Sequence, residues 1–223
     1  MAEPASNFFT RHLSSGERLG ELLFGLIMTL TFTLTAGFVV GSDRDAVREL
    51  LVATIGCNIA WGIIDGGLLV LGRLFDRGRF SRIGKAVRIA PDEAGAMAAV
   101  AAEMDEYLGE VAPATSRETL YRDIVRKVRS SEPRSWGVER EDWLAAIGAF
   151  WLVVFASIPA ALPFAFIDEP WRAIRVSNLI LLALFFVIGW RWATYTTVRP
   201  WHAAVALTAF GTAMVAAAIA LGG

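Results

Sequence analysis

The sequence predicts an all-α polytopic membrane protein with five transmembrane helices and a cytoplasmic helical segment between the second and third of them. Three observations support this prediction. Of the 223 residues, 55% are hydrophobic and only 19% are charged, which is a membrane composition. Five apolar runs have about the 20-residue length that a helix needs to cross a bilayer. The longest polar stretch lies between the second run and the third.

The five apolar runs define the predicted organisation of the chain. They cover Leu22–Gly41, Leu50–Leu71, Leu144–Phe166, Val176–Thr194 and His202–Leu221. The connector between the first two, SDRDAVRE, is only a short polar turn. We therefore expect an N-terminal amphipathic segment with the first two spans in residues 1–72. The cytoplasmic segment would follow in residues 73–142, and the last three spans in residues 143–223.

Basic residues set the expected orientation, because Lys and Arg in short loops favour the cytoplasmic side. With the N-terminus inside, that side receives a cluster directly after the second span, made of Arg73, Arg77, Arg79, Arg82, Lys85 and Arg88. The outer side receives only Arg44, Arg48, Arg172 and Arg175. We therefore expect an integral protein of a bacterial inner membrane, with a cytoplasmic N-terminus and an external C-terminus.

Charge and motifs argue against several classes of function. The formal net charge is -1, and no run of Lys and Arg is interleaved with aromatic residues, so nucleic acid is not an expected partner. The chain has no nucleophile elbow, P-loop, GxGxxG or Cys/His metal spacing, which leaves an enzyme without support. The single cysteine, Cys57, is typical of a small packed apolar side chain.

The second span contains two polar residues in the stretch GCNIAWGIIDG. Asn58 and Asp65 are two helical turns apart and share a face. A carboxylate at the centre of a membrane helix costs about 2.5–3.5 kcal/mol on insertion scales, so Asp65 is expected to be neutralised, paired or functional. Either both residues fix helix packing through hydrogen bonds, or they line an ion path. Gly62 and Gly66 form a GxxxG pattern that allows another helix to approach closely.

The first span offers groups that could reach this polar face. Glu17 and Glu21 are four residues apart near the inner interface, where they would form the mouth of a path. Thr29 lies on a face of small and hydroxyl-bearing residues that suits packing against the second span and hydrogen bonding to Asp65 or Asn58. Met28 is a soft thioether at mid-depth that could act as a ligand but is more often packing filler.

The polar segment predicts two helices, over Pro91–Val111 and from a capping box at Thr115 to Ser130. Two such helices are too short to fold alone, so we expect them to dock on the spans or on a second subunit. In the first helix, three carboxylates recur on one face, namely Glu103, Glu106 and Glu110. Aligned carboxylates can hold a divalent cation, although solvated acidic faces are common.

The pattern resembles the vacuolar iron transporter family. The resemblance lies in the five-span arrangement, in FGLIMTLTFTLTAG of the first span and in GCNIAWGIIDGGLLVLGRL of the second. It implies a homodimer that moves Fe(II) or Mn(II), usually against protons, between subunits along the first two spans. Asn58 matches a polar or acidic position of the second span, and Glu103, Glu106 and Glu110 occupy the place of a Glu-rich metal-collecting helix. Where the family has Asp-Gly in the first span, this chain has LIMTL.

These observations predict a homodimeric transporter for a divalent cation, Fe(II) or Mn(II), with exchange for protons. Asp65 would be the intramembrane ligand or proton carrier, and Asn58 a supporting oxygen ligand. Two other functions fit the same residues. One is a non-transporting membrane scaffold or regulatory protein in which Asp65 only forms hydrogen bonds, and the other is a channel for protons or small ions. The expected partners are the bilayer, a second copy and the transported ion.

Overall fold

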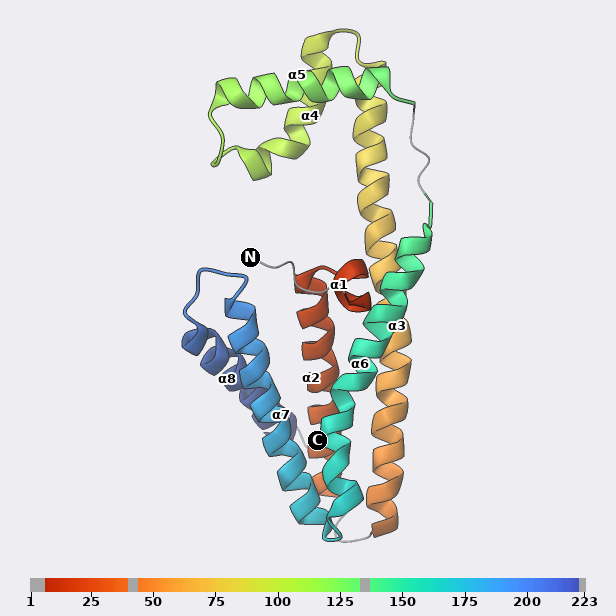
Figure 1. Cartoon of the computed structure of the whole chain (residues 1–223), viewed down its shortest axis with the longest axis vertical. Coiled ribbons are helices and arrows are strands. Elements are labelled where there is room, and N and C mark those ends of the chain that lie inside the picture. The colour runs from red at the N-terminus through yellow and green to blue at the C-terminus, as the bar shows by residue number, and fades with distance from the viewer. Residues whose placement is uncertain (1–6, 40–43, 133–136, 221–223) are drawn as a thin grey trace. The chain divides into compact units, whose positions relative to one another are not determined.

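The computed structural model describes residues 7–39, 44–132 and 137–220, and every regular element in these ranges is a helix (Figure 1). The helices are α1 (Phe8–His12), α2 (Ser15–Val39), α3 (Arg44–Ile89), α4 (Glu93–Leu108), α5 (Ala114–Ser130), α6 (Arg140–Phe166), α7 (Pro170–Ala193) and α8 (Pro200–Ala220). The all-α prediction is therefore confirmed for the described residues. The first predicted span was to end at Gly41, which lies outside them.

The chain forms two compact units. Unit 1 consists of Met1–Val70 and Arg140–Gly223, and unit 2 consists of Leu71–Glu139. Because α3 runs through the boundary at residue 70, this one helix contributes residues to both units.

Helix α3 is longer than the sequence pattern predicts. The second span was expected to end at Leu71, but the helix continues without interruption to Ile89 and has 46 residues. The apolar run stops near Leu71, yet the Arg-rich residues that follow are good helix formers. The helix ends just before Pro91, which disfavours helical backbone in the residue preceding it.

Unit 1 is a bundle of long helices. Helix α7 packs along α8, α6 contacts both α2 and α7, and the short α1 lies on α6. The central core of buried apolar side chains is formed by Leu26, Leu30, Ala156, Ala160, Leu181, Phe185 and Ile188. Gly189 allows α7 and α8 to approach closely, since a Cβ added there would lie 2.7 Å from the carbonyl oxygen of Ala203.

Three helices in the described residues are long and apolar enough to cross a membrane, which is fewer than the five predicted. They are Leu51–Ile89 of α3, then α6 and α7. Their outer faces carry large exposed apolar side chains, including Ile63 at 64% and Leu68 at 57% exposure. A soluble surface rarely presents apolar residues so densely along a helix, whereas a lipid-facing surface requires them. Unit 1 therefore has the character of a membrane-embedded bundle.

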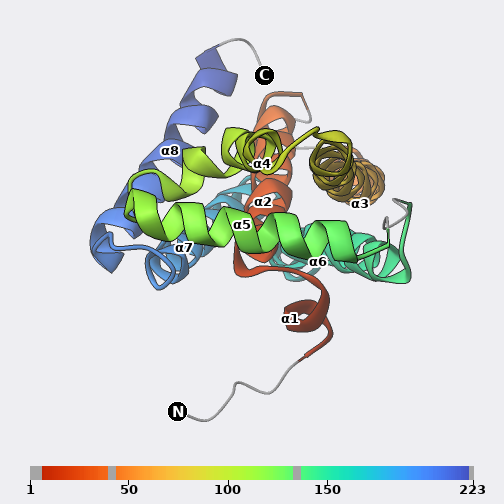
Figure 2. The ribbon, with the colours of Figure 1, turned by 90° about the horizontal axis from the view of Figure 1, so that it is seen from above.

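Unit 2 combines the end of α3 with α4 and α5, and Figure 2 shows α4 and α5 in the view from above. Its core is formed by Val87, Ala96, Val100, Tyr121 and Val125. The two polar-segment helices, which were expected to dock on a span or on a second subunit, pack here on the continuation of α3, which adds a third helix that carries Val87.

The helix boundaries in unit 2 follow from their caps. Helix α4 begins at Glu93, where the Asp92 side chain accepts a hydrogen bond from the backbone N–H of Gly95 at 2.7 Å. Helix α5 begins at Ala114, one residue before Thr115, and no side chain caps it. The predicted capping box at Thr115 is therefore wrong, because Pro113 occupies the cap position and presets the backbone there.

Candidate functional site

The α2 helix carries a stripe of polar and small residues in unit 1. Its members recur every four residues, and they are Glu17, Glu21, Gly25, Thr29 and Thr33. Residues at this spacing lie on one face of a helix, one above the other. The α2 face therefore presents an unbroken line of carboxyl, glycine and hydroxyl groups.

The α3 helix meets this stripe in antiparallel register. Glu21 interacts with Asp65, and Thr29 interacts with Asn58. Glu21 and Thr29 are eight residues apart on α2, and their partners Asp65 and Asn58 are seven residues apart on α3 in the opposite direction. Between these two polar contacts, the rings of Phe24 and Trp61 pack edge to face at 5.4 Å. The two helices therefore bring together the polar residues that the sequence predicted on each of them.

Asn58 is completely buried where α2, α3 and α6 meet. Its amide Nδ2 donates to Thr29 Oγ1 at 3.0 Å and also lies close to the carbonyl oxygens of Val153 at 3.3 Å and Gly25 at 3.4 Å. Within the described residues, its Oδ1 atom has no hydrogen-bond partner. An amide without hydrogen bonds is costly in an apolar environment. The Nδ2 group of Asn58, which lies on α3, therefore stabilises the packing of α3 against α2 and α6.

Glycines allow α6 to approach both helices at this level. A Cβ added at Gly25 would lie 2.7 Å from the Val153 carbonyl oxygen, and one at Gly66 would lie 3.0 Å from that of Ala146. Gly62 is similarly close to Phe150. The helix that approaches Gly62 and Gly66 most closely is α6, so the prediction that the first span covers this glycine face is wrong. This packing is within one chain.

Glu21 and Asp65 form the most unusual contact of unit 1. Their carboxyl groups lie within hydrogen-bonding reach of each other, α2 to α3. Since an ionised carboxylate can only accept, such a bond requires that one of the two groups hold a proton. The Oδ2 atom of Asp65 is buried and has no partner among the described residues. Two carboxyl groups that can share one proton therefore lie together in the bundle.

Glu17 caps the start of α2, and a sequence signature for this role is present. The backbone N–H of Ser14 donates to Glu17 Oε2 at 2.6 Å, and the backbone N–H of Glu17 donates to Ser14 Oγ at 3.2 Å. This is a capping box, and SSGE is its sequence signature. Glu17 therefore fixes the start of α2, and it also lies close enough to Glu21 for their charges to interact. Met28, on the same helix, is half-buried.

A second set of contacts joins the connection between α7 and α8 to the start of α2. Arg18 donates to the carbonyl oxygen of Leu13 at 2.5 Å and to Ser15 Oγ at 3.1 Å. Tyr195 hydrogen-bonds to Ser15 and to Arg18, and these contacts lower the pKa of its phenol. Nothing in the sequence predicted this cluster, because its members are about 180 residues apart.

Helix α7 adds polar contacts that the sequence reasoning missed. Thr33 Oγ1 donates to Asn178 Oδ1 at 2.9 Å, and Ser177 Oγ donates to the carbonyl oxygen of Ala160 at 2.8 Å. The first contact extends the α2 stripe onto α7. Asn178 lies in an apolar run of the sequence, as Asn58 does, so its position could have predicted a polar contact in the bundle.

The carboxylates predicted to bind metal in unit 2 are arranged differently. Glu103 is held by Arg79, whose Nε donates to it at 2.7 Å, and by Arg82 at 3.2 Å. The hydrogen bond from Arg79 lowers the pKa of Glu103. Glu106 and Glu110 are exposed, and Glu110 lies beyond the end of α4. Within the described residues, no three His, Cys, Asp or Glu side chains form a group suited to a metal ion.

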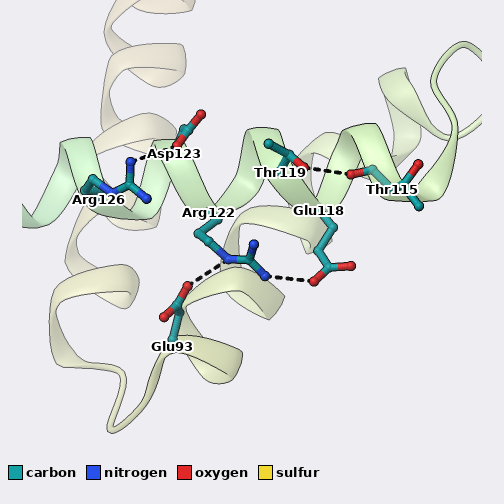
Figure 3. Close-up of polar contacts among 7 residues, drawn as sticks. All are labelled: Glu93, Thr115, Glu118, Thr119, Arg122, Asp123 and Arg126. Atoms are coloured by element: carbon teal, nitrogen blue, oxygen red, sulfur yellow. Dashed lines mark hydrogen bonds and ion pairs between the residues drawn. The ribbon is translucent and has the colours of Figure 1, made fainter.

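Several other charges of unit 2 are also paired. Asp105 accepts from Tyr121 Oη at 2.7 Å and from Arg117 at 2.5 Å, and the first of these bonds is the main reason that its pKa is lowered. Figure 3 shows the corresponding arrangement on α5, where Arg122 bridges Glu93 at 3.1 Å and Glu118 at 2.9 Å. Unit 2 thus uses its carboxylates to join α3, α4 and α5.

Comparison with known proteins adds no assignment. No family model matches the chain, and no curated protein matches it either. The resemblance to the vacuolar iron transporter family therefore stays a prediction, and the function is argued from the Glu21–Asp65 contact.

Proposed function

We propose that this protein is an integral membrane transporter for a cation, in which the Glu21–Asp65 pair binds either a proton or a divalent metal ion. Fe(II) and Mn(II) are the proposed metal substrates. When the shared proton leaves, two carboxylates, including the buried Asp65 Oδ2 atom, become available as oxygen ligands, which divalent cations prefer. Exchange of metal for proton would then occur at a single pair of side chains.

The single observation that carries this proposal is the contact between two carboxyl groups, one from each of two helices in an apolar bundle. A purely structural pair would be better served by one carboxylate and one amide, because neither then needs a proton. Neither Glu21 nor Asp65 forms an ion pair with a basic residue in the described part of the chain. An ionisable group inside a membrane span, as Asp65 is here, is by default a candidate for function.

The proposal also includes which helices cross the membrane, the orientation of the chain and its oligomeric state. We place α2 and α8 in the membrane beside α3, α6 and α7, with a cytoplasmic N-terminus, an external C-terminus and a second copy as partner. Support for α2 comes from its burial against α6 and α7, and support for the orientation comes from the Arg-rich continuation of α3. The proposed location is a bacterial inner membrane.

Uptake of Mn(II) into proteoliposomes, driven by a proton gradient, tests the proposal. We expect Asp65→Asn and Glu21→Gln each to reduce the initial rate on the order of 100-fold, because each variant removes a ligand and the shared proton. Glu106→Gln is the matched control, since it neutralises an exposed carboxylate of unit 2. An Asp65→Asn variant that transports at the wild-type rate would remove the pair from the mechanism.

A non-transporting scaffold or regulatory protein is the second candidate. The observation that favours it is Asn58, whose donor contacts to α2 and α6 already explain its place in the span. In that case no divalent metal would raise the melting temperature of the purified protein, because a ligand bound only by the folded state must stabilise it. A metal-dependent rise that disappears in Asp65→Asn would instead favour transport over the scaffold.

A further inference from the structure

A cavity lies in unit 1 at the end where α3 and α7 begin, away from the Glu21–Asp65 pair along α3. Its volume is about 540 Å³, and it opens between the start of α3, the end of α6 and the start of α7. Asp45 and Arg48 line it from the first turns of α3, and Asp168 lines it from the α6–α7 connection. Nothing in the proposed transport function uses this space.

The cavity has a charged rim and an apolar interior. Beyond the charged residues, its α3 wall continues through Leu51 to Ile55, and Phe164 lines it from α6. From Asp45 to Ile55 the helix rises roughly 15 Å, which is about half the thickness of the hydrocarbon core of a bilayer. The cavity therefore extends over the depth of one membrane leaflet, with its charges at the surface end.

Among the described residues of the rim, the charge without an ion-pair partner is positive. Arg48 forms no ion pair with any described residue, whereas Asp45 and Asp168 each already interact with another group. Helix α7 also begins at the cavity, with Pro170 in its first turn and no side-chain cap from Glu169. An unpaired guanidinium beside an uncapped helix N-terminus favours a phosphate group.

We propose that this cavity is a binding site for one phospholipid whose headgroup carries both a phosphate and a primary ammonium, as phosphatidylethanolamine does. The phosphate would lie at Arg48 and the start of α7, and the ammonium near the carboxylates of Asp45 and Asp168. The acyl chains would follow Ile55 and Phe164 toward the middle of the membrane. The two carboxylates at the rim disfavour a lipid with a purely anionic headgroup.

Native mass spectrometry of the purified full chain tests this site. The protein would be mixed with equal amounts of dioleoyl phosphatidylethanolamine, phosphatidylcholine and phosphatidylglycerol, and the bound species would be counted. We expect one phosphatidylethanolamine per chain to be retained preferentially. In Arg48→Gln its apparent affinity should fall roughly tenfold, because a charge-assisted hydrogen bond to phosphate is lost.

Two further variants separate binding in the cavity from nonspecific effects of charge. Arg175→Gln is the matched control, since Arg175 is an exposed arginine near the start of α7 that does not line the cavity. Ala161→Trp fills the cavity without changing its charge and should abolish lipid retention. Equal retention in wild type and Arg48→Gln, an equal loss in Arg175→Gln, or displacement of the lipid by inorganic phosphate alone would overturn the proposal. Because the assay measures binding, its result is independent of transport.

Discussion

The two units use carboxylates in opposite ways. In unit 2, Glu103 and Asp105 each contact an arginine, so that their negative charges join helices. In unit 1, Glu21 and Asp65 contact each other instead, and the pair needs a proton. Glu103, which belongs to the apparent metal site in the sequence, is therefore held in an ion pair, and two carboxyl groups that are 44 residues apart form the candidate site.

This difference follows from the surroundings of each unit. An exposed carboxylate in water loses little by forming an ion pair, and several such pairs can specify how short helices dock. A carboxylate in an apolar bundle cannot stay charged without a partner, so it is retained only where it is paired or functional. Our proposed site therefore lies in unit 1, and the predictions below test this contrast between the two units.

The largest expected effect concerns the tight packing of unit 1 around the site. Gly25→Ala should lower the free energy of unfolding by about 2 kcal/mol, because the added methyl group meets the Val153 backbone at 2.7 Å. Thermal unfolding in detergent measures this loss of stability. Gly78→Ala is the control in unit 2, where nothing lies within 4 Å, and it should be neutral or slightly stabilising. Equal losses in both variants would contradict the packing described for α2 and α6.

A smaller effect is expected at Asn58. Asn58→Leu keeps the branching and the number of side-chain heavy atoms but removes the donor to Thr29 and to the Val153 carbonyl oxygen, which should cost about 1 kcal/mol. Reversible unfolding in mild denaturing detergent is the measurement. Thr212→Val serves as the control, because the Thr212 hydroxyl is exposed and bonds only within its own helix. If Asn58→Leu were as stable as Thr212→Val, Asn58 would not tie the three helices together.

The smallest effect is a loss of unit 2 stability in acid. The pKa of Glu103 and that of Asp105 are both lowered in the folded protein, so their contribution is present above the pKa of the unfolded chain, about 4. It is lost as the pH falls through the lower folded values. Circular dichroism between pH 7 and pH 3 should show helix loss that is weaker in Asp105→Asn than in wild type. An identical acid transition in the variant would remove Asp105 from the explanation.

Much of the fold could be predicted, because the length of an apolar run can be read directly from consecutive residues of the sequence. The runs after Leu50, Leu144 and Val176 each correspond to a helix, and their polar interruptions identified Asn58 and Asp65 as unusual. The continuation of α3 to Ile89 could not be read from hydropathy, because a helix continues through polar residues as readily as through apolar ones.

The partners of the site residues could not be predicted, since they depend on how the helices are aligned. The contact of Glu21 with Asp65 requires the antiparallel register of α2 on α3, and that register is set by packing on α6. The ion pair between Glu103 and Arg79 likewise joins residues from two helices. Spacing within one helix placed the carboxylates on a face, but it could not show what lies opposite them.

Infrared difference spectroscopy of the purified protein tests the central claim most directly. Addition of Mn(II) should replace one carboxylic acid carbonyl band by carboxylate bands, as the proton shared by Glu21 and Asp65 is released to solvent. The signal should be present in wild type and in Glu106→Gln, and absent in Asp65→Asn. A wild-type protein that shows no loss of the carboxylic acid band at saturating Mn(II), or the same loss in Asp65→Asn, would contradict the account.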